Sequence, residues 1–298
     1  MKLFSLFIFI ITLPLAACAE ETHKPTPPPT KPEQSLAELC VASLKSLPGK
    51  TKEAALVEAC KDAAAINGCV STKGIPIFHV DHQSTAKDAR KILVIALIHG
   101  DEFPSGSVAR SWMERLSSIP TRNHWRIIPV LNPDGVKNKT RYNANGIDLN
   151  RNFPTKDWDQ QALKYWAQKM KKDKRRYPGE KAASETETRC AMAEIEDYKP
   201  DLILSIHTPY GVLDFDGPKI EIPKFAHIPW KSLGNYPGSL GRYMWVDRSK
   251  PILTIELQEK GVTEQLTKYD QLQDISGDIA IRSEKVIQKQ QKEIPKKP

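Results

Sequence analysis

The sequence predicts an α/β fold with a mixed, largely parallel central sheet and helices on both faces. Two observations support this class. Apolar, strand-like segments alternate with helical segments along the chain, and residues 91–98 (KILVIALI) form an almost continuous apolar run. Such a run is typical of a strand that is buried on both faces, as the strands of parallel sheets are. The chain has 298 residues, which is enough to bury a core without a metal or disulfides.

The composition indicates a globular protein with a mild positive charge. Charged residues make up 27% of the chain, hydrophobic residues 40%, and the formal net charge is +8. This balance excludes collagen-like, coiled-coil and globally disordered chains. A small positive charge favours anionic partners such as acidic peptides or lipid head groups, and we expect no nucleic-acid partner.

Residues 1–17 have the features of a secretory signal. Lys2 precedes an uncharged run of 15 residues, which is shorter than the roughly 20 residues of a membrane span. The run leads into LAAC at 15–18, which resembles the lipobox of bacterial lipoproteins. This resemblance implies a lipid on Cys18 and, because Ala19 rather than aspartate follows, a periplasmic location at the outer membrane. An ordinary signal peptide cut near Ala17 or Ala19 is the alternative.

The proline content of residues 18–34 predicts an extended tether. Five prolines lie between positions 25 and 32, and proline both blocks helix formation and lacks a backbone donor. The sixteen residues 19–34, at about 3.1 Å each, would reach on the order of 50 Å.

Residues 35–68 predict a helical hairpin, since apolar residues recur at helical spacing on both sides of Pro48-Gly49. Besides Cys18 the chain has four cysteines, which allow three pairings that the sequence cannot choose among; they are Cys40, Cys60, Cys69 and Cys190. An exported protein can form disulfides. A bond between Cys40 and Cys60 is favoured because each lies in one helix of the hairpin.

Residues 69–292 are expected to form the main domain. Periodicity places strands at 75–80, 91–98, 125–131, 201–206 and 251–257, and helices at 107–116, 164–176, 184–198 and 265–291. The helix at 184–198 starts with SETE, the pattern of a capping box. The basic run at 171–176 is interpreted as a solvated helix face.

Candidate metal ligands follow two of these strands. KILVIALI leads into His99 and Glu102, which are three residues apart, and the strand DLILSI leads into His207. In α/β sheets ligands bind at the carboxyl ends of the strands. Two imidazoles and one carboxylate are the ligand set of a catalytic Zn²⁺ with an open fourth position. By itself the spacing of His99 and Glu102 is a weak signal, and His207 by itself is equally compatible with a hydrogen-bonded core position.

Two further segments carry residue types suited to peptide hydrolysis. Glu256 ends the strand PILTI, where its carboxylate could act as general base beside a cation. In the loop 141–154 (RYNANGIDLNRNFP), Arg141 and Arg151 flank several amide side chains. The planar fork of arginine matches a carboxylate, so this loop indicates recognition of a carboxylate and a polarised carbonyl.

Five short motifs occur in a fixed order: HGDE, NPDG, GIDLNRNFP, SIHT and TIEL, which begin at positions 99, 132, 146, 205 and 254. Together they resemble the zinc metallocarboxypeptidases of the carboxypeptidase A type, and the resemblance covers about 71–258. It implies the fold of those enzymes, a zinc peptidase catalytic domain at 69–292, and a zinc ion held by His99, Glu102 and His207.

The same resemblance implies roles for four other residues. Glu256 is the general base and later protonates the leaving amine. Arg141 stabilises the oxyanion. Asn150 and Arg151 hold the terminal carboxylate of the substrate.

The segments 207–218 and 236–243 are similar to bacterial murein-peptide amidases, which cleave between γ-D-glutamate and meso-diaminopimelate. The similarity implies murein peptides as substrates, which fits a lipid-anchored periplasmic enzyme. The expected oligomeric state is a monomer.

Diaminopimelate carries a second amino-acid head, so both signs of charge are expected in the pocket. Asp214 or Asp216 would contact its ammonium group, and Arg242 a carboxylate. Tyr243 or Tyr236 would be the mobile tyrosine of such enzymes. Turn aspartates that cap their own backbone are the alternative for the two acids.

Two other functions stay open. One is a zinc carboxypeptidase that removes C-terminal D- or L-residues from muropeptides or ordinary peptides. The other is a non-catalytic cell-wall-binding lipoprotein, in which a zinc ligand or the general base would be lost. All four of these residues are present here.

Overall fold

The computed structural model describes residues 34–66, 68–258 and 260–293. The predictions for the signal segment, for Cys18 and for most of the tether lie outside these residues. Within the described ranges, no helix combines the length and the apolar character needed to cross a membrane.

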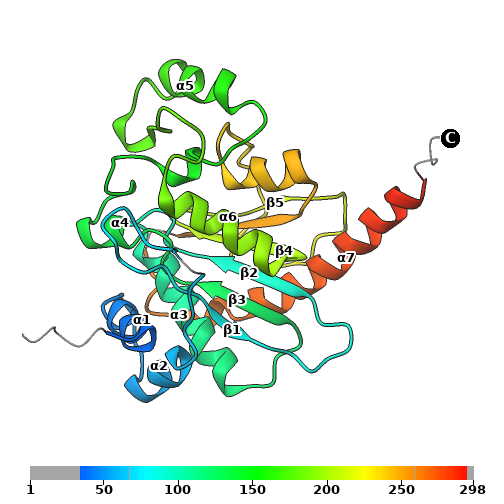
Figure 1. Ribbon diagram of the computed structural model, residues 1–298. Helices are drawn as coiled ribbons and strands as arrows, with labels where there is room; N and C mark the ends of the chain where they lie inside the picture. Colours follow the sequence, from blue (N-terminus) through cyan, green and yellow to red (C-terminus); the bar gives the residue numbers. More distant parts are fainter. Residues whose placement is uncertain (1–33, 67, 259, 294–298) are drawn as a thin grey trace, which may run out of the picture. The chain divides into compact units, whose positions relative to one another are not determined.

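The strands of the described chain form one six-stranded mixed sheet with the order β1-β3-β2-β4-β6-β5 (Figure 1). The four central strands β3, β2, β4 and β6 are parallel, and the edge strands β1 and β5 are antiparallel to their neighbours. This arrangement confirms the predicted fold class. The strands are β1 (Val80–His82), β2 (Lys91–Ile95), β3 (His124–Ile128), β4 (Leu202–His207), β5 (Tyr210–Asp216) and β6 (Ile252–Gln258).

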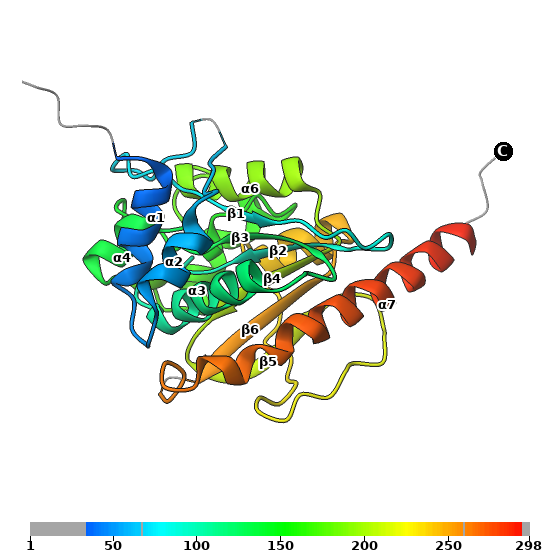
Figure 2. The same cartoon turned by 90° about the horizontal axis from the view of Figure 1, so that it is seen from below.

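Helices cover both faces of the sheet. The helices α3 (Phe103–Ser118) and α7 (Gln271–Glu293) pack on one face and α6 (Thr186–Tyr198) on the other, as Figure 2 shows from below. In β2, Ile92 and Val94 belong to the core under α3 and α7, whereas Leu93 and Ile95 belong to the core under α6. Both faces of this strand are buried, which explains its continuous apolar run.

The N-terminal hairpin consists of α1 (Leu36–Lys45) and α2 (Glu53–Cys60), joined by a disulfide between Cys40 and Cys60. It packs on α3, where the buried Arg110 donates four hydrogen bonds to backbone carbonyls at 44, 47, 48 and 49. The second disulfide joins Cys69, ahead of β1, to Cys190 in α6.

Three local predictions are wrong. The strand expected at 75–80 begins only at Val80, because the preceding residues form isolated bridges instead of a ladder. The helix expected at 164–176 is α5 (Trp158–Gln168), which ends before the basic run. The capping box expected at 184–187 is not formed; α6 begins after Glu185, whose carboxylate binds the side-chain amide of Asn143 instead.

The basic run continues as a turn and a short 3₁₀ helix. Lys171 and Lys172 both have positive φ, which ends the helical path. The remaining helical elements are α4 (Pro133–Asn138), η1 (Leu149–Arg151), η2 (Lys174–Arg176), the π-helical turn η3 (Arg242–Val246) and η4 (Leu266–Tyr269).

Candidate active site

The three predicted metal ligands meet at the carboxyl ends of β2 and β4. His99 lies in the loop after β2, Glu102 is the N-cap residue of α3, and His207 ends β4. The loop after β2 passes very close to α4, since a Cβ on Gly100 would lie 2.1 Å from the carbonyl carbon of Gly135. A larger residue at 100 would therefore push the loop that carries two of the ligands away from its support.

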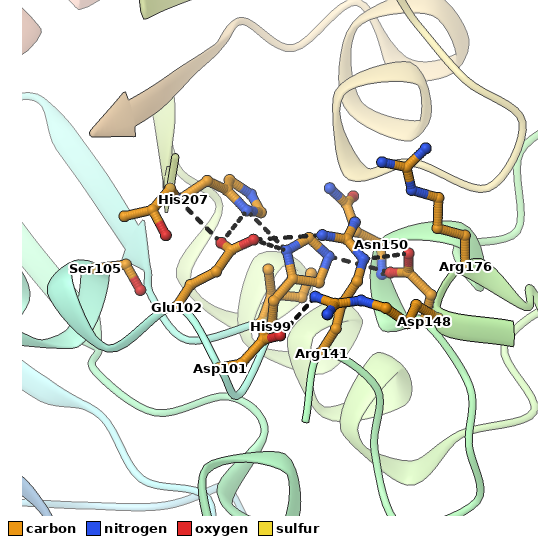
Figure 3. A network of polar contacts seen from close by, with 12 residues as sticks. His99, Asp101, Glu102, Ser105, Arg141, Asp148, Asn150, Arg176 and His207 are labelled. Carbon is orange, nitrogen blue, oxygen red and sulfur yellow. Dashed lines mark hydrogen bonds and ion pairs between the residues drawn. The ribbon is translucent and has the colours of Figure 1, made fainter. Parts of the chain in front are cut away.

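The ligand atoms of these residues converge on one point. Nδ1 of His99 lies 2.8 Å from Oε1 of Glu102 and 3.2 Å from Nδ1 of His207, which lies 3.1 Å from Oε2 of Glu102 (Figure 3). All three residues are buried. Zinc ligands lie about 2.0–2.1 Å from the ion, so ligand atoms in a tetrahedral site are separated by about 3.3 Å, close to the distances between these atoms.

The outer nitrogens of both imidazoles are held by other side chains. Nε2 of His99 donates to Oδ1 of Asp148 at 3.1 Å, and Nε2 of His207 is 2.8 Å from Oγ of Ser205. Burial opposes the charge of Asp148, but Arg141 and His99 hold the pKa of this carboxyl below its ordinary range. Because Asp148 is ionised, the proton of His99 lies on Nε2 and the lone pair of Nδ1 faces the other ligands.

The donor set therefore fits Zn²⁺. A lone pair on His99, a carboxylate oxygen of Glu102 and a nitrogen of His207 point at one another, and a shared cation removes their mutual repulsion. Burial works against the charge of Glu102, but the two imidazoles hold the pKa of its carboxyl below the ordinary glutamate value. It is therefore an ionised ligand, and the set has two imidazoles and one carboxylate, as catalytic zinc sites do.

Glu256 lies beside this cluster because β6 pairs with β4. His207 and Glu256 are direct register partners, and Oε2 of Glu256 accepts a hydrogen bond from the backbone N–H of Tyr210 at 3.5 Å. The carboxylate is largely buried but lines the cavity described below. Burial raises the pKa of Glu256, and the nearby His207 opposes this shift. A carboxylate of raised basicity suits a general base.

Arg141 lies on the other side of the ligand cluster. Its Nε donates to Oδ2 of Asp148 at 3.0 Å and its Nη1 to Oε1 of Glu102 at 3.3 Å. Burial disfavours its charge, but the two carboxylates raise the pKa of the guanidinium. Arg141 is therefore a fixed cation at the edge of the metal cluster, where it can donate to a developing oxyanion.

Asn150 and Arg151 lie next to each other in η1. Oδ1 of Asn150 accepts from the backbone N–H of Leu240 at 2.8 Å, so its amide orientation is fixed. Nη1 of Arg151 donates to the carbonyl of Asn150 at 2.6 Å, and the guanidinium carbon lies 4.8 Å from the ring centroid of Tyr236.

One cavity of about 800 Å³ joins these groups. The predicted residues that line it are His99, Glu102, Arg141, Asn150, Arg151, His207, Asp214, Asp216 and Glu256.

Asp214 and Asp216 lie in β5 and not in a turn, so the alternative of turn aspartates is wrong. Oδ2 of Asp214 accepts from the backbone N–H of Leu233 at 2.9 Å, and burial raises the pKa of Asp214 to about 6.

Two predicted substrate contacts lie elsewhere and must be corrected. Arg242 does not line the cavity, because its Nη2 and Nε pair with the carboxylate of Asp157 at 2.8 and 3.0 Å. Tyr243 is 3% exposed and packs against Phe153, with ring centroids 5.5 Å apart, because the turn η3 directs it into the core under α6. Tyr236 lines the cavity instead.

Several residues of this site are not predicted by the sequence patterns. Asp148 and Ser205 lie inside the motifs GIDLNRNFP and SIHT, but their role depends on which imidazole nitrogen faces the metal, and the sequence does not show this. Arg175 and Arg176 belong to the basic run at 171–176, but both line the cavity.

Such a cavity suits a metal-dependent hydrolase that acts on peptide bonds close to a carboxylate. Comparison with known proteins agrees, since residues 66–215 match the family model described as zinc carboxypeptidase. The chain therefore belongs to the zinc carboxypeptidase family and is a hydrolytic enzyme.

Individual relatives have low sequence identity to this chain. Murein peptide amidase A of Escherichia coli (strain K12) is 28% identical over 188 residues, which are 59% of this chain and 75% of the relative. The protein of the same name from Vibrio campbellii (strain ATCC BAA-1116) is 27% identical over 198 residues, which are 63% of this chain and 76% of the relative.

Two solved structures share the fold. The murein-tripeptide amidase of Escherichia coli O157 has a TM-score of 0.54 at 24% identity, covering 73% of this chain and 93% of its own. Carboxypeptidase A of Helicoverpa armigera has a TM-score of 0.56 at 16% identity, covering 83% and 79%.

Proposed function

We propose that this protein is a zinc-dependent hydrolase of murein peptides that cleaves the bond between γ-D-glutamate and meso-diaminopimelate. The relatives named murein peptide amidase A support the substrate class. The observation that carries the proposal is that Glu256, the three metal ligands and the carboxylate-binding loop line one cavity. A substrate whose scissile bond lies next to a free carboxylate can contact the metal site, Glu256 and the loop 141–154 at the same time.

The residues of this chain would divide the reaction among them. Asn150 and Arg151 bind the α-carboxylate of the diaminopimelate residue and so fix the position of the scissile amide. Arg141 donates to the carbonyl oxygen, where negative charge develops; one such donor contributes about 3–4 kcal/mol to transition-state stabilisation.

Glu256 would move the proton. It accepts a proton from the attacking water and passes it to the nitrogen of the leaving amine, so that the amide bond breaks and a carboxylate and an amine are formed. Zn²⁺ held by His99, Glu102 and His207 would polarise the carbonyl and lower the pKa of water to about 7.

Asp214 and Asp216 are proposed contacts for the ammonium group at the far end of diaminopimelate. Both line the cavity, and each already accepts one hydrogen bond from the segment 233–235. A carboxylate has further acceptor positions, so a contact with the segment leaves room for a ligand.

The proposed location is the periplasm, with a lipid on Cys18 that holds the enzyme at the outer membrane through residues 18–34. The lipobox-like LAAC at 15–18 and the prolines of the tether support this. We propose a monomer whose partners are murein peptides and the membrane, without nucleic acid.

The decisive experiment is mass analysis of products from defined muropeptides with and without a chelator. L-Ala-γ-D-Glu-meso-diaminopimelate should release free diaminopimelate in a chelator-sensitive reaction. If zinc-loaded enzyme leaves this tripeptide and its longer forms uncut, the proposed bond is wrong. Release of only the terminal D-residue from a tetrapeptide, with accumulation of the tripeptide, would identify a carboxypeptidase instead.

A further inference from the structure

Two guanidinium groups in the cavity lack a close carboxylate partner among the described residues. Arg151 has none within 4.0 Å, and its buried Nε has no hydrogen-bond acceptor. Arg176 has only a long contact of 3.8 Å from its Nε to Asp173. The other cavity arginines are paired, Arg141 with Asp148 at 3.0 Å and Arg175 with Asp101 at 2.7 Å.

Arg151 and Arg176 line the same cavity. Burial lowers the pKa of Arg151, the charge of Asp148 opposes this shift, and the positive charges of Arg141 and Arg176 add to it. Arg176 and Asn150 both line the cavity, and in Figure 3 no dashed contact reaches Arg176 from the other residues drawn. Within the part of the chain that the structure describes, its Nη1 donates to the thioether of Met170 at 3.2 Å, which is a weak acceptor.

The backbone that carries Arg176 is held in place. Asp173 caps η2 by accepting from the backbone N–H of Arg175 at 2.9 Å, and its carbonyl accepts from Nε1 of Trp166 at 2.8 Å. The rings of Trp166 and Tyr177 pack with centroids 4.9 Å apart. Arg176 therefore lies at the cavity wall on a turn whose backbone is held by these hydrogen bonds.

We infer that Arg176 binds a second carboxylate on the C-terminal residue of the substrate and so determines specificity for it. The inference rests on the proposed function, in which Asn150 and Arg151 hold the α-carboxylate. Two guanidinium groups of one cavity that have no close carboxylate partner among the described residues are suited to a residue that brings two carboxylates, because each fork can bind one of them. Specificity then extends to a side chain that ends in a carboxylate, alone or together with an ammonium group.

Two tripeptides that differ only in this carboxylate test the inference. They are L-Ala-γ-D-Glu-meso-diaminopimelate and L-Ala-γ-D-Glu-L-lysine, because lysine is diaminopimelate without its second carboxylate. The variants are Arg176→Gln and, as a matched control, Lys174→Gln, an exposed cation of the same turn that does not line the cavity. kcat and KM are measured for both peptides, and binding of both is measured by calorimetry in a Glu256→Gln background.

Arg176→Gln should lower kcat/KM for the diaminopimelate peptide about 10- to 100-fold, the range expected for a hydrogen-bonded charge pair. It should change kcat/KM for the lysine peptide less than threefold, and Lys174→Gln should change neither. The dissociation constants should follow the same pattern, and Arg176→Lys should retain part of the preference.

An equal loss for both peptides, or no loss for either, overturns the role of Arg176. Thermal melting of each variant shows whether an equal loss reflects misfolding, and in that case Arg176→Lys decides. If the unsubstituted enzyme cleaves neither peptide, the proposed function fails, which is a different result from a failure of the Arg176 inference.

Discussion

His207 and Glu256 are register partners on the parallel strands β4 and β6, so their side chains emerge from the same face of the sheet. Paired strands lie about 4.8 Å apart, which places a proposed metal ligand and the proposed base side by side. The preceding pair, Ile206 and Ile255, belongs to the opposite core under α3 and α7. A slip of one residue in β6 would therefore bury Glu256 in that core and remove it from the cavity.

The first prediction follows from this neighbour relationship. Glu256→Gln should retain zinc and bind substrate, because the amide has the same shape and Glu256 is not among the three converging ligands. kcat should fall about 10²- to 10⁴-fold, because the amide cannot accept the proton. Zinc content by mass spectrometry, substrate affinity by calorimetry and kcat check this. Glu264→Gln, at an exposed glutamate, is the control, and normal turnover in Glu256→Gln would contradict the assignment of the base.

The second prediction concerns the residue behind His99. Asp148→Asn keeps all three ligands but removes the negative charge of residue 148. The hydrogen bonds that this residue accepts from Nε2 of His99 and from the Arg141 guanidinium become weaker. Zinc affinity should fall about 10- to 100-fold, as for other residues that orient a metal-bound histidine. Competition with a chelator of known zinc affinity measures the change. Unchanged affinity would show that the contact between Asp148 and His99 does not orient the ligand.

The sequence predicts the part of the site that depends on strand ends. The ligands and Glu256 follow buried apolar strands, and parallel strands bring their carboxyl ends to one edge, so their approach follows from the pattern. The continuous apolar run of β2 likewise predicted a strand buried on both faces. The strand ends and the buried strand β2 are encoded by short apolar segments, whose burial determines where each strand lies.

Other parts of the site depend on chain paths that periodicity does not encode. Tyr243 enters the core because η3 is a π-helical turn. Arg242 forms an ion pair with Asp157, which lies 85 residues earlier in the chain. Arg176 faces the cavity because positive φ angles at Lys171 and Lys172 end the helical path before η2. A charge run gives no sign of such a turn. The interpretation as a solvated helix face is therefore wrong for the helix and for Arg176, although the three lysines of the run are exposed.

The third prediction is a pH dependence of stability at Asp214. Burial raises its pKa from the ordinary 3.8 to about 6, with further contributions from the charges of Asp216 and Glu256 and an opposing one from the N–H of Leu233. Between about pH 4 and pH 6 the folded protein binds more protons at this group than the unfolded chain. The contribution of Asp214 to the free energy of unfolding therefore falls as pH rises through this window.

The comparison that isolates this effect is with Asp214→Asn, whose amide oxygen still accepts from Leu233. Relative to this variant, the unsubstituted protein should lose on the order of 2–3 kcal/mol between pH 4 and pH 7. Chemical denaturation of both proteins at several pH values measures the difference. A constant difference across the window would show that Asp214 titrates at its ordinary pKa.

The fourth prediction ranks the two disulfides by the chain length that each one closes. The Cys69–Cys190 bond spans 121 residues and the Cys40–Cys60 bond spans 20. If a disulfide acts by restricting the unfolded chain, its loss costs about 5 kcal/mol for the longer loop and about 3 kcal/mol for the shorter one. Cys69→Ala with Cys190→Ala should therefore lower the free energy of unfolding more than Cys40→Ala with Cys60→Ala. Denaturant titration of both double variants tests the order, and a larger loss for the Cys40–Cys60 pair would show that support of the N-terminal hairpin on α3 outweighs loop closure.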